Sequence, residues 1–426
     1  MAADTIFAVS SGSPPAAISV IRVSGAEAHR AGAQLAGSLP AAREAAVRHL
    51  RAADGSLLDE ALVLRFDGPG SSTGEDLVEL HCHGGRAVLA AVLDALGGIE
   101  DLRQAEPGEF TRRAFENGRI DLTEAEGLAD LIEAETESQR RAALMTAEGG
   151  LRKEISHWQQ RLLDLSARAE AAIDYVDEDS VDANPSLSRD CGALAAELSG
   201  WLARPRAEPL RDGVRVVIAG PPNAGKSSLL NTIVGFERAI VTDIPGTTRD
   251  HIEVPLALSG VPIRLTDTAG LRESGELVER IGVDRARQLT ELAEVLVWLG
   301  EPVDAPDHPR LIQVHSRADL PERRESPAGA IAVSSVTGEG LIALTQAVVT
   351  EARLVLPAEG EIALNARQAD CVAQARDALE QAESSGDLVI VAESLRQARS
   401  AFDQLTGRAG VEDLLDALFG RFCLGK

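Results

Sequence analysis

Hydrophobic and polar positions along the chain predict a mixed first part and a helical second part. Four short apolar runs bounded by turn residues have the length of strands: residues 6–9, 18–23, 61–66 and 77–82. Residues 86–96 have a helical pattern. From Leu151 onward, apolar residues recur every three or four positions, as in a long amphipathic helix packed against other helices. We therefore expect an α+β unit followed by a helical bundle.

A third pattern begins at residue 214, where an apolar, β-branched run leads into residues 220–227. Their G-x-x-x-x-G-K-[ST] spacing is that of a phosphate-binding loop between a strand and a helix. The two glycines let backbone N–H groups wrap a polyphosphate, and the helix directs its positive end toward it. In such a loop Lys226 reaches the terminal phosphates and Ser227 holds magnesium.

Two later segments match the remaining parts of a GTPase. Residues 240–250 form a loop with proline, glycine and two threonines, suited to a switch that closes on the γ-phosphate and magnesium. A strand then ends at Asp267, where a carboxylate lies near the magnesium, and the backbone of Gly270 can reach the γ-phosphate. Leu271 stands where small signalling GTPases carry the glutamine that orients water, so we expect the catalytic polar group elsewhere.

Base recognition departs from the usual pattern. Residues 316–319, Ser-Arg-Ala-Asp, occupy the place of Asn-Lys-x-Asp, and Asp319 keeps the carboxylate that accepts two N–H bonds from guanine. Ser316 is shorter than Asn and should tie the base loop less firmly to the phosphate loop, while Arg317 keeps an aliphatic stem for stacking. We expect weak nucleotide binding.

Composition narrows the class of protein. At 426 residues the chain is too long for one core, and 44% hydrophobic with 26% charged residues is ordinary for a soluble globular protein. Neither a membrane span nor a secretion signal is expected. The net charge of -25 argues against a general nucleic-acid coat. The widely spaced cysteines suit a reducing cytosol rather than disulfides or zinc: Cys82, Cys191, Cys371 and Cys423.

Polar residues in the first unit leave two questions open. Glu79, His81 and His83 share one face of a strand, which predicts a pocket wall, and a metal site is a weaker alternative without an evident third ligand. Arg22 is a lone cation in a strand. It is either a strand-edge charge or a pocket anchor for a carboxylate.

The end of the chain returns to helix, and this completes the predicted architecture. Residues 411–422 place apolar side chains on one face, so they should dock onto the earlier helices. The fold class is then multidomain α/β, with an N-terminal α+β domain (1–118), a discontinuous helical domain (119–210 and 355–426) and an inserted P-loop GTPase domain (211–354) with a parallel sheet and flanking helices.

These parts together resemble one family, the tRNA modification GTPases MnmE (TrmE). The resemblance rests on TGEDLVELHCHGG, RRAFENGRIDLTEAEGLADLI, VVIAGPPNAGKSSLLN, IVTDIPGTTRD, VERIG and the terminal CLGK. It implies a cytoplasmic homodimer whose N-terminal domains bind a 5-formyl-tetrahydrofolate or related folate. It also implies a heterotetramer with a flavin-dependent partner, MnmG (GidA). On this resemblance, the complex would add a carboxymethylaminomethyl or aminomethyl group at carbon 5 of the wobble uridine of certain tRNAs.

The resemblance also assigns site residues. Folate would contact Arg22, Glu79, Arg119 (a Lys in many relatives) and Lys426. Potassium would lie among Asn223, Thr242, Ile244 and Thr247, and magnesium would be held by Ser227 and Thr248. Glu279 would orient water, with Lys226 at the phosphates. The GTP site would comprise Asn223, Ala224, Gly225, Lys226, Ser227, Ser228, Thr242, Asp243, Ile244, Pro245, Gly246, Thr247, Thr248, Asp267, Thr268, Ala269, Gly270 and Asp319.

Cys423 is a further candidate, because a chain-end tail has little reason to carry a packed thiol. Its thiolate could assist the modification if Lys426 or Arg421 lowers its pKa. Two other classes of function stay open. A ribosomal RNA assembly factor would predict a basic RNA-binding domain, and none is visible. A nucleotide-sensing scaffold with little hydrolysis is allowed by the altered guanine loop.

Overall fold

The computed structural model describes residues 4–174, 183–236, 253–268, 288–323, 325–409, 412–422 and 425. The chain forms two compact units, Met1–Ala129 with Asp403–Lys426, and Asp130–Phe402.

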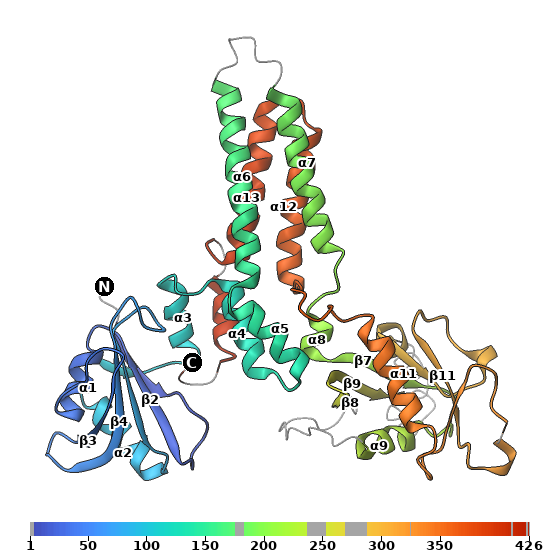
Figure 1. Cartoon of the computed structure of the whole chain (residues 1–426), viewed down its shortest axis with the longest axis horizontal. Helices are drawn as coiled ribbons and strands as arrows, with labels where there is room; N and C mark the ends of the chain where they lie inside the picture. The colour runs from blue at the N-terminus through green and yellow to red at the C-terminus, as the bar shows by residue number, and fades with distance from the viewer. Residues whose placement is uncertain are drawn as a thin grey trace, which may run out of the picture. The chain divides into compact units, whose positions relative to one another are not determined.

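The first unit is built on a six-stranded sheet in the order β3-β4-β5-β2-β1-β6 (Figure 1). Its strands are β1 (Thr5–Val9), β2 (Ile18–Ser24), β3 (Ala45–Arg51), β4 (Leu57–Phe66), β5 (Leu77–His83) and β6 (Leu102–Gln104). The four predicted strands are confirmed within a residue or two, except that β4 starts earlier. Helices α1 (Ala28–Ala36) and α2 (Arg86–Gly97) pack in one core with Ile21, Val78 and Leu80. One face of the sheet is therefore covered by both helices.

The opposite face is covered at β1, where Ile6 and Ala8 contact Phe110 of α3 (Glu109–Glu116). The final helix, α14 (Glu412–Phe419), packs against α3 and α4 (Leu122–Glu133). Phe419 is 2% exposed and its ring lies 6.3 Å from that of Phe115. The predicted docking of the chain's last apolar face onto earlier helices is confirmed.

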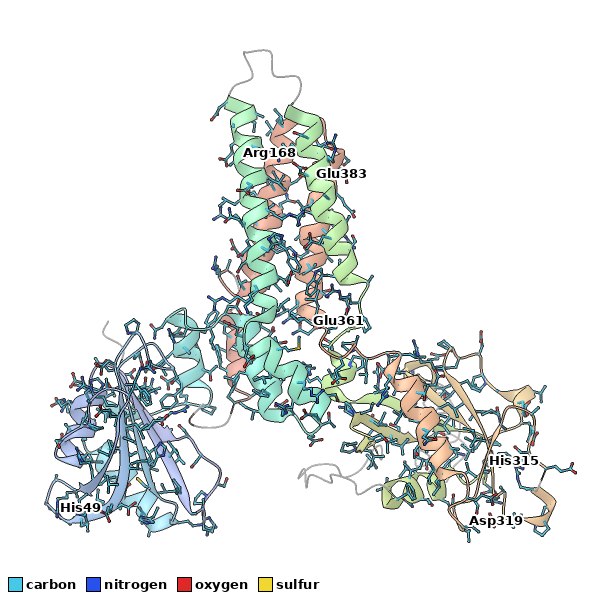
Figure 2. All side chains as sticks on the ribbon, viewed as in Figure 1. His49, Arg168, His315, Asp319, Glu361 and Glu383 are labelled. Carbon is cyan, nitrogen blue, oxygen red and sulfur yellow. The ribbon has the colours of Figure 1, made fainter. Side chains whose placement is uncertain are left out.

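The second unit contains the predicted helical bundle. It consists of α6 (Gly150–Asp174), α7 (Ala183–Leu202), α12 (Ala366–Ser384) and α13 (Leu388–Thr406). Trp158 is fully buried at its centre, with its ring 5.3 Å from Trp201 and 5.9 Å from Phe402. Charged side chains such as Arg168, paired with Asp190 at 2.6 Å, lie on the outside (Figure 2). None of the described helices is both long and apolar enough to cross a membrane.

The nucleotide part of this unit is a second six-stranded sheet, ordered β12-β11-β10-β7-β9-β8. Its strands are β7 (Val214–Ala219), β8 (Glu253–Leu258), β9 (Val261–Asp267), β10 (Val295–Trp298), β11 (Leu311–Ser316) and β12 (Ile331–Val333). All pairings are parallel except that of β8 with β9. The carboxyl ends of the parallel strands thus meet at one edge, where ligands of such sheets bind.

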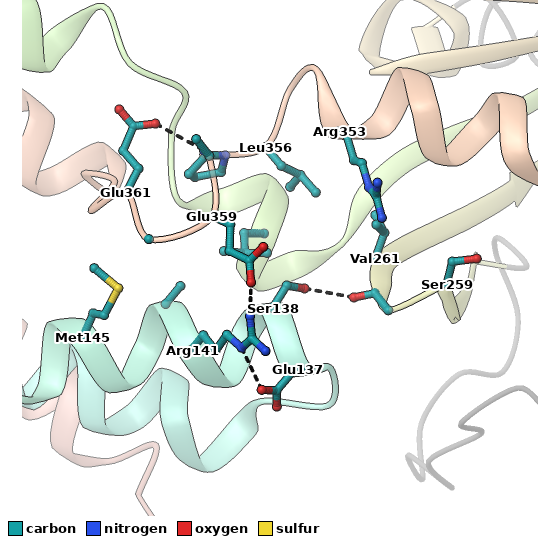
Figure 3. A pocket seen from close by; sticks show the side chains of 16 residues that line it. Glu137, Ser138, Arg141, Met145, Ser259, Val261, Arg353, Leu356, Glu359 and Glu361 are labelled. Atoms are coloured by element: carbon teal, nitrogen blue, oxygen red, sulfur yellow. Dashed lines mark hydrogen bonds and ion pairs between the residues drawn. The ribbon is translucent and has the colours of Figure 1, made fainter.

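Helix α5 (Glu137–Ala147) joins the bundle to this sheet. Ser138 Oγ donates to Gly260 O at 2.9 Å in the β8–β9 turn, and Gln139 Nε2 donates to Arg211 O at 2.9 Å. Beside these contacts lies a cavity of about 480 Å³, whose walls also include Arg353 and the segment after α11 (Leu341–Arg353) (Figure 3). None of its lining residues belongs to the phosphate loop, so this cavity is not the nucleotide site.

Candidate functional site

The phosphate loop joins β7 to α9 (Lys226–Phe236), and three of its residues have positive φ. They are Gly220 at 149°, Asn223 at 60° and Gly225 at 93°. A Cβ on Gly220 would lie 3.2 Å from the Cβ of Leu299, so both backbone angle and space favour glycine there. Asparagine is among the few side-chain-bearing residues that adopt this conformation readily. Such backbone turns form concave sites that bind anions.

Three of the predicted nucleotide residues meet at the end of β7 and β9. Lys226 is only 7% exposed, and its Nζ donates to Gly220 O at 3.0 Å and Pro221 O at 2.8 Å. Ser227 Oγ donates to a carboxylate oxygen of Asp267. A hydroxyl beside a carboxylate supplies the hard oxygen ligands that magnesium prefers, so this pair fits the predicted ion.

The base loop is tied directly to the phosphate loop. Ser316, at the end of β11, donates its hydroxyl proton to Ala224 O at 2.7 Å and is 7% exposed. Serine is shorter than the usual asparagine, yet it still makes a hydrogen bond to the phosphate loop. A hydroxyl nevertheless offers fewer hydrogen bonds than an amide. The Nε of Arg317 lies 3.9 Å from where a Cβ of Gly225 would be, so this side chain is close to the phosphate loop.

Asp319 is oriented by a residue whose role we did not predict. Ser334 is fully buried after β12, and its Oγ donates to Asp319 Oδ1 at 2.6 Å. Ser334 Oγ also accepts the N–H groups of Val336 at 3.2 Å and Thr337 at 3.1 Å. Ser334 therefore couples the turn after β12 to the carboxylate expected to recognise guanine (Asp319 is labelled in Figure 2). Ser334-Ser335-Val336 stands where Ser-Ala-Lys is common in GTPases, and this first serine is the sequence signal for the role.

A second polar cluster lies in the first unit, on the sheet face away from α1 and α2. The β2–β5 register places Arg22 opposite Glu79, and Arg22 Nε donates to Glu79 Oε1 at 2.9 Å. His81 Nε2 lies 3.1 Å from Glu79 Oε2. Burial raises the pKa of Glu79, but the bonds from His81 and Arg22 outweigh it and lower that pKa overall. Arg22 is thus paired with a carboxylate of its own sheet, and its contact with a ligand stays a prediction.

The predicted face of β5 is confirmed, but its three polar side chains do not form one cluster. His83 pairs instead with Asp59, Nδ1 to Oδ1 at 2.7 Å. Among the described residues, the side chains close enough to share a metal ion are a different set, His29, Asp67 and Asp76. The metal alternative for β5 therefore gains no support.

Of the other two folate candidates, Arg119 is among the described residues and Lys426 is not. The Cγ of Arg119 lies 3.2 Å from where a Cβ of Gly74 would be. Lys426 is outside the described residues, but Gly425 before it is buried, and its carbonyl accepts from Ser10 Oγ at 2.7 Å. Gly425 therefore lies against the end of β1, in the same unit as Arg22 and Glu79.

Several predicted site residues lie outside the described part of the chain. They are Thr242, Asp243, Ile244, Pro245, Gly246, Thr247, Thr248, Ala269, Gly270, Glu279, Cys423 and Lys426. Their roles stay predictions.

The phosphate loop, the Ser227–Asp267 contact and the Asp319 loop on a mainly parallel sheet define a P-loop nucleotide-binding protein of the GTPase class. Comparison with known proteins makes this specific. A model of the GTP-binding protein TrmE N-terminus matches residues 5–119, and a model of the MnmE helical domain matches residues 122–423.

Full-length relatives agree with these matches. The tRNA modification GTPase MnmE of Erythrobacter litoralis is 54% identical over 425 residues, covering 99% of this chain and 100% of the relative. That of Novosphingobium aromaticivorans is 52% identical, covering 99% and 100%. That of Rhizorhabdus wittichii is 54% identical, covering 100% and 97%. The chain belongs to the tRNA modification GTPase MnmE family.

Proposed function

We propose that this chain hydrolyses GTP to drive tRNA modification in the cytoplasm. With a flavin-dependent partner, MnmG, it would add a carboxymethylaminomethyl or aminomethyl group at carbon 5 of the wobble uridine of certain tRNAs. The observation that carries the proposal is the meeting of Lys226, Ser227 and Asp267 at one edge of a parallel sheet, in a chain related to MnmE over its full length.

Each residue of the phosphate site has a proposed task. Lys226, held by loop carbonyls, would turn to the β- and γ-phosphates when nucleotide enters. Ser227 and Thr248 would hold magnesium, which supplies charge stabilisation at the phosphates. Asn223 would contribute its side-chain oxygen to a potassium site with Thr242, Ile244 and Thr247. Its exposure and positive φ place it at the surface of the loop.

A folate site in the N-terminal domain, residues 1–118, would supply the one-carbon unit. The Arg22–Glu79 pair offers a cation for folate carboxylates or carbonyls and a carboxylate for the pterin N–H edge. Glu79→Ala should weaken binding of 5-formyl-tetrahydrofolate by calorimetry and leave GTP turnover unchanged. Undiminished folate affinity would remove Glu79 from the site.

The same domain is proposed to form the homodimer. Val47 and Leu62 are paired across β3 and β4, and they are 57% and 38% exposed on the face that α1 and α2 leave open. Ile18 on β2 is 62% exposed. Apolar side chains gathered in this way favour an interface. Val47→Asp together with Leu62→Asp should therefore yield monomers in sedimentation, and an unchanged dimer would exclude this face.

The tRNA function is tested by mass spectrometry of wobble uridines from cells that lack this protein. We expect loss of the carboxymethylaminomethyl and aminomethyl nucleosides, while unchanged nucleosides would exclude the modification function and favour a role in ribosome assembly. Turnover measured with GTP and with ATP separates an enzyme from a nucleotide-sensing scaffold. The enzyme should hydrolyse GTP at a much higher rate than ATP.

A further inference from the structure

His81 contacts Glu79, and the sequence assigned it no task beyond a place in the predicted pocket wall. The two side chains are two positions apart on β5 and so lie on the same sheet face, next to Leu62 and Val20 in the cross-strand register. Their side chains are 27% and 15% exposed, and His81 Nε2 lies 3.1 Å from Glu79 Oε2. Because Arg22 binds the other oxygen at 2.9 Å, each carboxylate oxygen of Glu79 has its own partner.

This arrangement fixes the plane of the carboxylate. A carboxylate held through one oxygen can still rotate about its last torsion, since such torsions are broad in energy. Bonds to both oxygens, from two different strands, remove that freedom. Each oxygen can accept two hydrogen bonds, so one position per oxygen stays available to a ligand.

We propose that His81 is a positioning residue that holds Glu79 in the orientation needed to accept the paired N–H groups of a pterin ring. This inference rests on the proposed folate site and adds to it the residue that sets its geometry. The imidazole acts through its Nε2–H, for which the neutral ring suffices. A carboxylate that is already held in its binding orientation loses less conformational entropy when the ligand binds, and this favours affinity.

The matched variants follow from side-chain length. The amide nitrogen of glutamine is four bonds from Cα, as is Nε2 of histidine, whereas that of asparagine is one bond shorter. His81→Gln should therefore restore the donor to Glu79, and His81→Asn should not. His83→Ala is the control, because His83 is two residues further on the same face and pairs with Asp59.

The test is calorimetry of 5-formyl-tetrahydrofolate binding to the full-length protein, with GTP turnover and thermal melting measured in parallel. We expect about ten-fold weaker folate binding for His81→Ala and His81→Asn, as for loss of one charge-assisted bond. His81→Gln should bind within about three-fold of the wild type, and His83→Ala should be unchanged. GTP turnover should be the same in all.

Wild-type affinity in His81→Ala would overturn the assignment, as would equal losses in the glutamine and asparagine variants. A wild-type protein that binds no folate would instead overturn the folate site itself, and His81 with it. The two failures are therefore distinguishable.

Discussion

Replacement of Ser334 by alanine tests the guanine site through a residue that does not itself carry the recognising group. The hydroxyl donates to Asp319 Oδ1 at 2.6 Å and accepts two backbone N–H groups, while its side chain is fully buried. Ser334→Ala removes a bond to an ionised carboxylate, and such bonds contribute about 1.5–3 kcal/mol. Asp319, which is exposed, would then be free to rotate into water.

Part of that energy is regained when water solvates Asp319, so we expect GTP and GDP affinity to fall by about 1–2 kcal/mol, or roughly five- to thirty-fold. Titration with a fluorescent GDP analogue measures this loss. ATP affinity should hardly change, because adenine lacks the N–H pair that Asp319 is expected to bind. Ser335→Ala is the control, since no hydrogen bond of its hydroxyl is found in the described part of the chain.

A double-mutant cycle separates this effect from local unfolding. If Ser334 acts through Asp319, then Ser334→Ala should cost little further affinity in a protein that already carries Asp319→Ala. Additive losses would refute the reasoning and would show that Ser334 supports the loop by its backbone bonds alone. Wild-type affinity in the single variant would refute it equally.

Three further predictions concern hydrolysis and the cysteines. Glu279→Ala should lower GTP turnover by orders of magnitude with GTP affinity little changed. A variant that loses only GTP affinity would indicate that Glu279 is an ordinary surface residue without a catalytic role. GTP turnover should be faster in potassium than in sodium if Asn223 helps hold the cation, and equal rates would count against that site. Burial raises the pKa of Cys82 to about 12 and of Cys191 to about 11, so alkylation of the native protein near pH 8 should label Cys423 first. Faster labelling of Cys82 would contradict this order.

Much of the fold could be predicted because its signals are local. The phosphate loop is set by glycine spacing, and α6 by apolar residues that recur with the helical period around Trp158. Strand β3 was not predicted because only Leu50 is buried in it. Its Arg and His side chains interrupt the alternation of apolar and polar residues by which a strand is recognised. Its place depends on pairing with β4, which no short window of sequence contains.

The candidate site shows the same division. Lys226, Ser227 and Asp267 were predicted because motif spacing fixes their roles relative to the phosphates. The bonds of Ser334 to Asp319 and of His81 to Glu79 were not predicted, since each depends on tertiary placement of side chains. The Ser138 contact with the β8–β9 turn was likewise missed, because its partner is 122 residues away and is a backbone carbonyl.

The central claim is that nucleotide hydrolysis at this phosphate loop drives tRNA modification. Its most direct test is complementation of cells lacking the protein with either the wild type or Lys226→Ala, at matched expression, followed by mass spectrometry of wobble uridines. Lys226 carries the charge that reaches the β- and γ-phosphates, so the variant should fold but leave the wobble uridines without the carbon-5 group. Wild-type levels of the modified nucleoside in cells carrying Lys226→Ala would contradict the claim.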